Sequence, residues 1–232
     1  MSLNINDFPL WTAIVTPLLE NGEVDYPTLE NLLRKQESAR NGVVVLGSTG
    51  EALNLNPDEK EKILNLALGL KLKIPLMAGV GGINLTETSA WVKYLNTLPL
   101  DAYMMVTPIY AKPGTEGQFH WFKSLMDIAS KPVVVYNVPG RTAVALSVDA
   151  LKRLSTHPRL WGLKEASGNI VDFKRYQEAA PNVRIFSGDD AMTPMFCANG
   201  AKGLISVASN VWPEATHKIV DLCLEKAFEE SE

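Results

Sequence analysis

Eight short, almost continuously apolar runs alternate with longer amphipathic segments along the whole chain, and this alternation limits the possible folds more than any other feature. Strands that are apolar on both faces are typical of parallel sheets covered by helices on both sides. We therefore expect eight parallel strands. The runs are WTAIVTP (11–17), GVVVLGS (42–48), IPLMAGV (74–80), AYMMVTP (102–108), PVVVYNV (132–138), LWGLKEA (160–166), VRIFSGD (183–189) and GLISVAS (203–209).

The segments between these runs carry the start signals and the periodicity of helices. Asn56 is placed to cap a helix whose first residue is a proline, and Ser147 precedes residues 148–154 in the same way. In an earlier segment, the 3.6-residue period is followed by Leu29, Leu32, Leu33 and Gln36, of which Gln36 is the one polar member. Strand and helix patterns thus alternate throughout.

Eight strand–helix units in 232 residues predict a closed (β/α)8 TIM barrel that forms one domain over residues 1–232. An open doubly wound sheet also alternates strands and helices. However, no unit carries a convincing dinucleotide-binding fingerprint, because Gly79, Gly81 and Gly82 lack a third glycine at the required spacing. The closed barrel is therefore the favoured fold.

Composition excludes several classes of partner and site. A net charge of −4 argues against a nucleic-acid or anionic-membrane surface, and no apolar run approaches membrane-spanning length. The start of the chain lacks the basic and apolar regions of a signal peptide. With two cysteines and three histidines, none at metal-ligand spacing, we expect no disulfide framework, no metal and no cofactor. A cytoplasmic location is the default expectation.

Polar residues collect at the ends of the expected strands, where TIM barrels carry their active sites. This grouping predicts an active site at the carboxyl-terminal mouth of the barrel. The residues are Thr16, Ser48, Thr49, Thr107, Tyr110, Tyr136, Arg141, Lys164, Asp189, Asp190 and Ser206.

Lys164 stands out because it ends an otherwise apolar run. In an extended strand, Gly162 and Lys164 share the inward face, and Trp161 and Leu163 suit the helix-facing side. Burial disfavours the charged amine and lowers its pKa, which would make Lys164 a nucleophile towards carbonyl groups through a Schiff base. The alternatives are a lysine neutralised by Glu165 or an aspartate, or a surface lysine.

The neighbours of Lys164 suit such chemistry. A Schiff-base cycle moves protons at each step, and hydroxyls of Tyr136, Thr49 and Tyr110 on the same rim could relay them. The planar guanidinium of Arg141 would suit a substrate carboxylate. Each residue alone also has a structural explanation, because rim tyrosines, turn hydroxyls and solvated arginines are common.

Taken in order, the motifs GSTGE, AGVG, VTPIYAKP, VVYNVPGRT, GLKEASGN, SGDD and GLISVASN resemble the dihydrodipicolinate synthase / N-acetylneuraminate lyase family of class I aldolases. The resemblance covers nearly the whole chain and implies a (β/α)8 barrel. It also implies that Lys164 forms a Schiff base with pyruvate and that Tyr136 transfers protons. Thr49 would assist, together with Tyr110 from a neighbouring subunit of a homodimer or homotetramer.

The arginine in YNVPGRT favours the synthase branch of the family, which condenses pyruvate with aspartate-4-semialdehyde on the way to diaminopimelate and lysine. Arg141 would bind the carboxylate of the aldehyde, and we also expect Ser48, Thr49, Gly188 and Ile205 to contact substrate. Another pyruvate-dependent aldolase of the family, acting on a sugar acid or 4-hydroxy-2-oxoglutarate, and a non-catalytic barrel remain alternatives. A metal-dependent aldolase is a further rival, although Asp189 and Asp190 are better explained as caps of the following helix.

The chain departs from the family pattern in two places. Positions that match the polar residues of the lysine feedback site are mostly changed, which predicts weak or absent inhibition by lysine; they are Ala52, Pro57, Lys60 and Ile83, with only Glu87 retained. The small helical extension that follows the barrel in the family is expected to be missing. The last helix would then expose apolar side chains, including Ile219, Leu224 and Phe228.

Overall fold

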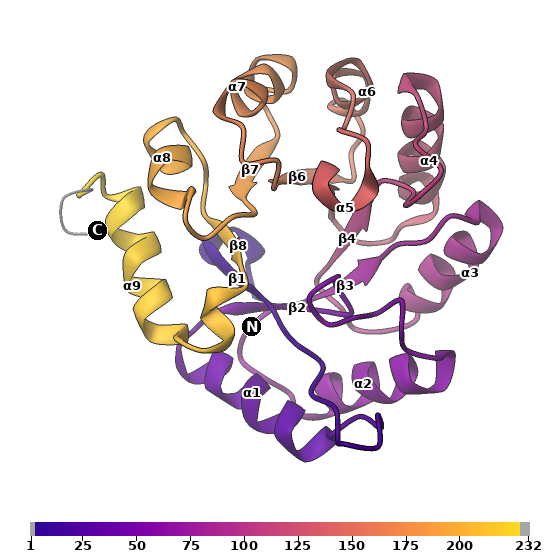
Figure 1. The fold of residues 1–232 in the computed structure, drawn as a ribbon, viewed down its shortest axis with the longest axis vertical. Coiled ribbons are helices and arrows are strands. Elements are labelled where there is room, and N and C mark those ends of the chain that lie inside the picture. Colours follow the sequence, from indigo (N-terminus) through magenta and orange to yellow (C-terminus); the bar gives the residue numbers. More distant parts are fainter. Residues whose placement is uncertain (1–2, 228–232) are drawn as a thin grey trace.

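In a computed structural model that describes residues 3–227, all eight expected strands form a closed parallel barrel, paired in chain order with β8 returning to β1. Helices surround this barrel on its outside (Figure 1). The (β/α)8 prediction is therefore confirmed. The strands are β1 (Leu10–Ala13), β2 (Gly42–Val45), β3 (Leu76–Val80), β4 (Ala102–Val106), β5 (Val133–Asn137), β6 (Leu160–Glu165), β7 (Arg184–Ser187) and β8 (Leu204–Ser206).

One helix follows each strand except β5, which is followed by two because the single-turn α5 precedes α6. Short 3-10 helices, Ile5–Asp7 and Ala208–Asn210, lie before β1 and after β8. The helices are α1 (Tyr26–Ser38), α2 (Pro57–Gly69), α3 (Leu85–Leu95), α4 (Thr115–Ile128), α5 (Pro139–Thr142), α6 (Val148–Leu154), α7 (Ile170–Ala179), α8 (Thr193–Ala198) and α9 (Pro213–Leu224).

The helix starts expected from the sequence are confirmed. Asn56 accepts a hydrogen bond from the Glu59 N–H, and the Glu59 carboxylate accepts one from the Asn56 N–H, which together form a capping box. Ser147 likewise accepts a hydrogen bond from the Ala150 N–H at the start of α6. These caps supply partners for N–H groups that have none within their own helix.

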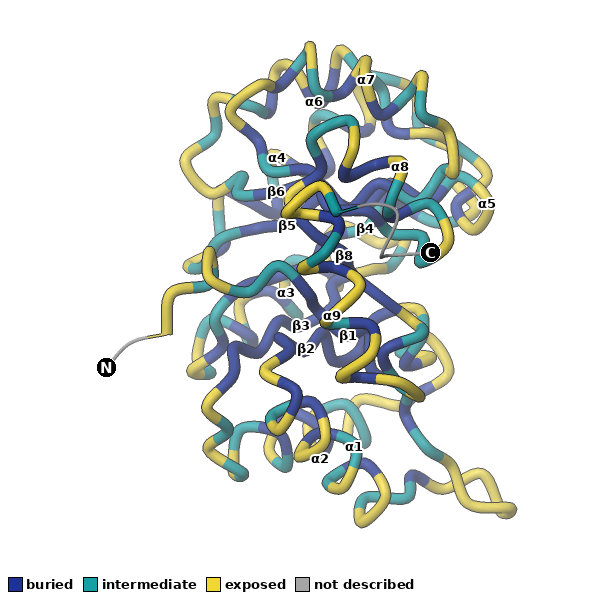
Figure 2. The backbone as a smooth tube through the Cα atoms, turned by 90° about the vertical axis from the view of Figure 1, so that its left-hand side faces the viewer, coloured by how far each residue is buried: buried dark blue, intermediate teal, exposed yellow. Residues whose placement is uncertain are grey.

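Apolar side chains form one layer inside the barrel and another between the barrel and its helices. Figure 2 shows the resulting concentration of buried chain along the strands, with exposed chain at the periphery. Because every strand is covered on both faces, its residues are apolar without alternation. The inner layer includes Trp11, Val44, Met77, Met104, Val134, Phe186 and Ile205.

Gln36, the polar member of the apolar face of α1, is fully buried and joins three segments of the chain. Its carbonyl oxygen accepts hydrogen bonds from Thr12 (2.7 Å) and Asn41 (2.9 Å), and its amide donates to the backbone oxygen of Ser209 (2.9 Å). Ser209 in turn donates to the Thr12 hydroxyl (2.8 Å). Gln36 thus connects α1 to β1 and to the chain after β8.

The expected orientation of Trp161 is wrong. Val133 pairs with Leu160 but Val134 pairs with Gly162, so β6 contains one extra residue at its amino end. Leu160 therefore packs on the outer layer, and Trp161 turns inward, with its ring centre 5.3 Å from that of Phe186. From Gly162 onward the register is regular, so the inward direction expected for Lys164 is unaffected.

The last helix buries Val220 and Cys223, while Ile219 and Leu224 are 38% and 37% exposed. The larger exposed apolar side chains lie just before α9, where Val211 and Trp212 are 68% and 64% exposed. Phe228 lies outside the described residues. Exposed apolar surface is therefore greater at the turn into α9 than along the helix.

Replacing Gln36 by leucine should lower the free energy of unfolding by about 3 kcal/mol, because three buried hydrogen-bonding groups would lose their partner. Urea unfolding of the purified chain measures this change. Lys35→Leu on the exposed side of the same helix is the matched control and should change stability by less than about 0.5 kcal/mol. Equal stability of Gln36→Leu and the unsubstituted protein would contradict the structural role of this network.

Candidate functional site

The carboxyl ends of the strands open into a cavity of about 960 Å³. Its inner wall includes Ser48, Tyr136 and Arg141, and an outer limb reaches Lys60 of α2 and Trp91 of α3. The cavity occupies the end of the barrel at which TIM-barrel enzymes carry their active sites.

Lys164 ends β6 inside the barrel and is only 2% exposed. Gly188 leaves the space that the lysine stem occupies, because a Cβ atom there would lie 3.0 Å from both Cγ and Cε of Lys164. Burial lowers the pKa of the amine to about 8; the Asp190 carboxylate opposes this shift and the Arg141 guanidinium adds to it. About a tenth of the amine is then neutral at pH 7, far more than for a solvated lysine.

Glu165 does not neutralise this amine. Because successive residues of a strand point to opposite sides, the Glu165 side chain lies on the helix-facing side of the barrel wall. There it accepts hydrogen bonds from the Asn137 amide (2.6 Å) and the Ser167 N–H (2.8 Å). The Glu165 carboxylate thus has neutral hydrogen-bond donors as partners. It does not form an ion pair with Lys164, whose side chain points into the barrel.

Tyr136 lies beside Lys164, since the two residues are paired across β5 and β6. The Lys164 Nζ atom is 4.4 Å from the centre of the Tyr136 ring. Burial raises the pKa of the phenol, whereas a hydrogen bond with Ser48 and the charge of Arg141 act in the opposite direction. The phenol is therefore protonated at neutral pH and placed next to the amine.

The Ser48 hydroxyl is close enough to Tyr136 to lower the pKa of the phenol. Thr49 follows it in the β2–α2 loop and is partly buried, and its proposed contact with the phenol stays a prediction. The sequence alone could not decide between these adjacent hydroxyls, because their directions depend on the loop from Gly47 to Gly50. Thr16, in the loop after β1, supports this loop by donating to the Gly50 oxygen (2.7 Å).

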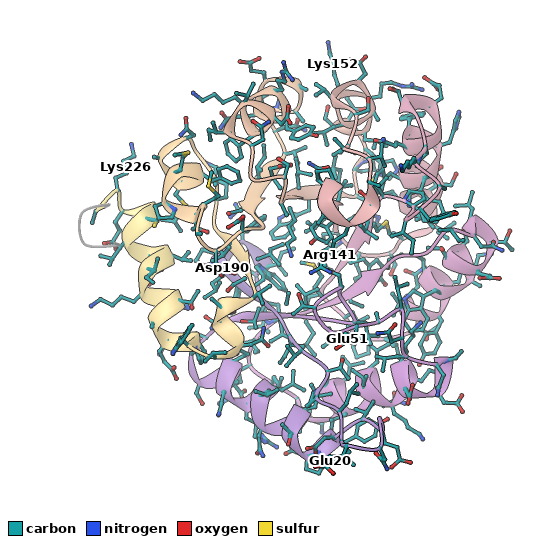
Figure 3. The ribbon with its side chains drawn as sticks, in the orientation of Figure 1. Glu20, Glu51, Arg141, Lys152, Asp190 and Lys226 are labelled. Atoms are coloured by element: carbon teal, nitrogen blue, oxygen red, sulfur yellow. The ribbon has the colours of Figure 1, made fainter. Side chains whose placement is uncertain are left out.

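Arg141 projects from α5, and Asp190 from the loop after β7, on two sides of the barrel mouth (Figure 3). Arg141 lines both the main cavity and a second depression of about 670 Å³. Tyr110 and Lys112 also line this second depression. Arg141 therefore lies between the inner site and the outer surface that carries Tyr110.

Tyr110 is not brought to Tyr136 within this chain. Its side chain is 90% exposed, and its backbone has a φ of +64°, in the left-handed region that is costly for a bulky residue. The loop from β4 to α4 therefore presents this ring to solvent. The predicted three-hydroxyl relay is not assembled from one copy of the chain.

Asp190 does not cap α8, contrary to expectation. Its carboxylate accepts hydrogen bonds from the Ser206 hydroxyl (2.5 Å) and from the N–H groups of Val207 and Ala208 (3.0 and 3.2 Å). Asp189 is the residue that accepts from N–H groups at the entrance to α8. Asp190 thus holds the end of β8 close to Lys164, a role that strand alternation could not reveal.

The remaining predicted residues differ in their surroundings. Ile205 is fully buried in the inner apolar layer, where it pairs with Trp11 of β1. Thr107 is also buried, and its hydroxyl has no hydrogen-bond partner within residues 3–227. Ile205 therefore lies below the polar rim, whereas Gly188 lies against the lysine stem.

The outer limb of the cavity includes the positions compared with a lysine feedback site: Ala52, Pro57, Lys60, Ile83 and Glu87. Burial lowers the pKa of Lys60. Ile83 is 60% exposed, so this limb offers an apolar side chain where the family pattern has a polar one. Weak or absent lysine inhibition stays a prediction.

Among residues 3–227, no group of three or more His, Cys, Asp and Glu is arranged to hold a metal ion. No helix in the same range combines the length and apolarity needed to cross a membrane. The thiols of Cys197 and Cys223 are free and buried, and burial raises the pKa of Cys197 to about 12.

Comparison with known proteins gives a consistent result. The chain is 48% identical over 220 residues to a 4-hydroxy-tetrahydrodipicolinate synthase of Francisella philomiragia, covering 95% of this chain and 74% of that protein. It is 45% identical over 216 residues to the enzyme of the same name from Wolbachia pipientis wMel, with 93% and 74% coverage.

Solved structures agree. The pyruvate-complexed dihydrodipicolinate synthase of Acinetobacter baumannii superposes with a TM-score of 0.92 at 32% identity, over 97% of this chain and 78% of that chain. A monomeric dihydrodipicolinate synthase variant gives a TM-score of 0.91 at 33% identity, over 97% and 77%. The family model of the dihydrodipicolinate synthetases matches residues 9–232. With the sequence matches, this result shows that the chain belongs to the dihydrodipicolinate synthetase family.

Proposed function

We propose that this protein is a 4-hydroxy-tetrahydrodipicolinate synthase that condenses pyruvate with L-aspartate-4-semialdehyde. The observation that carries the proposal is the buried Lys164 amine, with its pKa lowered to about 8, beside the Tyr136 ring at the mouth of the barrel. A lysine in such surroundings is suited to form a Schiff base with a ketone. The names of the curated relatives support the choice of substrates.

The first step is attack of the neutral Lys164 amine on C2 of pyruvate, which gives a carbinolamine. Loss of water from this adduct requires a proton for the leaving hydroxyl, and the Tyr136 phenol, whose ring centre is 4.4 Å from the amine, is placed to supply it. The resulting protonated imine loses a proton from C3 to the Tyr136 phenolate and forms an enamine. The enamine carbon then bonds to the aldehyde carbon of the second substrate, whose oxygen takes the proton back from Tyr136. The amino group of that substrate finally attacks the imine carbon, which closes the ring, returns a proton to Tyr136 and releases the Lys164 amine.

Substrate carboxylates are assigned to two parts of the site. The Ser48 and Thr49 region would bind pyruvate, because the glycines around these hydroxyls allow backbone N–H groups to converge on an anion. Arg141 would bind the carboxylate of the aldehyde through its planar guanidinium. Gly188 would contribute by leaving room beside the Lys164 stem, and Ile205 by closing the apolar floor.

Tyr110 is assigned to the site of a neighbouring subunit in a homodimer or homotetramer. Support comes from its 90% exposure and its strained backbone, since a bulky apolar ring held in solvent by a left-handed residue is costly without a partner. Arg141 lines the same depression, so a phenol received there from another copy would adjoin the main cavity. The cytoplasmic location stays a prediction.

Treatment with sodium borohydride in the presence of pyruvate should reduce the imine and leave a 1-carboxyethyl group on the Lys164 amine, which adds to the mass of the peptide that contains it. Peptide mass spectrometry measures the adduct, and Lys164→Ala is the control that should remain unlabelled. No adduct on Lys164, or an adduct on another lysine, would favour the non-catalytic barrel.

The rate of adduct formation at a fixed excess of pyruvate should rise with pH, reach half its maximum near pH 8 and level off above about pH 9. The neutral amine is the nucleophile, so lowering the pH below the pKa of Lys164, about 8, removes the reactive form. Initial trapping rates between pH 6 and pH 9.5 check this. A rate that continues to rise towards the pKa of a solvated lysine would contradict the effect of burial.

Replacing Arg141 by alanine should raise the KM for the aldehyde by roughly a hundredfold, because a charge-assisted bidentate contact is lost. Adduct formation with pyruvate should change much less, since it does not use that contact. Steady-state kinetics and borohydride trapping on the same preparation compare the two steps. Equal losses in both would refute the assigned role of the guanidinium.

A further inference from the structure

Directly behind Tyr136 and Lys164, on the helix-facing side of the barrel wall, lies a buried pair formed by Asn137 and Glu165. The two residues are 1% and 0% exposed and are paired in register across β5 and β6. The Asn137 amide donates to Glu165 Oε2 over 2.6 Å. This short contact lies one residue beyond the register pair that brings the phenol to the amine.

The same two side chains also hold the loops that follow their strands. Asn137 Oδ1 accepts the Leu146 N–H (2.8 Å), which fixes the far end of the segment that carries Arg141. Glu165 Oε1 accepts the Ser167 N–H (2.8 Å) at the start of the loop after β6. The Asn137 amide nitrogen therefore donates, and the Asn137 oxygen and both Glu165 oxygens accept.

We propose that Asn137 and Glu165 are positioning residues, which hold the Tyr136 phenol, the Lys164 amine and the Arg141 segment in one geometry for Schiff-base chemistry. The role depends on the proposed function, because it acts through Lys164. A displacement of about 1 Å between reacting groups can reduce a rate by roughly a hundredfold. The pair is suited to prevent such a displacement, since it connects the two strands at the height of the reacting atoms.

The donor and acceptor pattern suggests a complementary exchange. In Glu165→Gln only one side-chain oxygen remains to accept, so either the Asn137 amide or the Ser167 N–H would meet another donor and lose its acceptor. In Asn137→Asp two carboxylates would face each other. In the double variant Asn137→Asp/Glu165→Gln, the Asp oxygens accept from Leu146 and from the Gln amide, and the Gln oxygen accepts from Ser167. Complementarity is restored with the charge moved to the neighbouring strand.

The test measures the rate of borohydride-trapped adduct formation at saturating pyruvate, together with the pyruvate concentration that gives half the maximal rate. Each single variant should react roughly ten- to a hundredfold more slowly, with the half-saturating concentration changed by less than about threefold. The double variant should recover to within about threefold of the unsubstituted protein. All rates are taken well below the thermal unfolding midpoint of each variant.

Tyr176→Phe is the matched control for a purely structural loss. The Tyr176 hydroxyl donates to the Leu146 oxygen (2.7 Å), so this variant loses a buried hydrogen bond to the same loop without altering the pair. It should lower the thermal midpoint but leave the trapping rate within about twofold.

The proposal is overturned if the single variants lose only thermal stability, or if the double variant regains its thermal midpoint without regaining its rate. An unsubstituted protein that forms no adduct at all would instead overturn the proposed function, and the positioning role with it. Slow single variants, a restored double variant and an unaffected Tyr176→Phe together support the proposal.

Discussion

The Lys164 amine and the Tyr136 ring lie side by side, almost fully shielded from water, and the rest of the barrel mouth is arranged around this contact. A primary amine in such a place loses hydration, so its neutral form gains relative to its charged form. The barrel makes the burial possible because two neighbouring parallel strands bring both side chains inward at the same height. Charged groups at the rim then shift the pKa of the amine in opposite directions: Asp190 raises it and Arg141 lowers it.

Two polar residues of the fold, Gln36 and Asp190, have hydrogen-bond partners that connect separate segments of the chain. Gln36 joins α1 to β1 and to the segment after β8. Asp190 holds the end of β8 by accepting from one hydroxyl and two N–H groups. Burying such groups without partners would be costly, whereas satisfied networks favour one arrangement of the core over its competitors. The barrel closes through the seam between β8 and β1, and Gln36 lies directly beside that seam.

The fold could be predicted from the sequence because parallel strands covered on both faces have a distinctive apolar pattern, and because helix caps use a small set of residues. Lys164, Tyr136 and Arg141 could be placed at one end of the barrel because the carboxyl ends of its strands converge there. Three details could not be predicted. The extra residue at the start of β6 changes the direction of Trp161, the loop after β2 brings the Ser48 hydroxyl close enough to lower the pKa of Tyr136, and Asp190 bonds across to β8. Each depends on backbone positions that strand periodicity does not encode.

The irregularity in β6 has a broader consequence. The additional residue is accommodated at the amino end of the strand, where Trp161 joins Trp11 and Phe186 in an aromatic floor, and pairing is regular again from Gly162. The extra residue at the amino end therefore leaves the pairing of Tyr136 with Lys164 unchanged, although Phe186 reaches both regions because it pairs with Lys164 across β6 and β7. A single inserted residue at the base of a barrel strand can thus be absorbed by a local bulge, while the chemistry at the other end keeps its spacing.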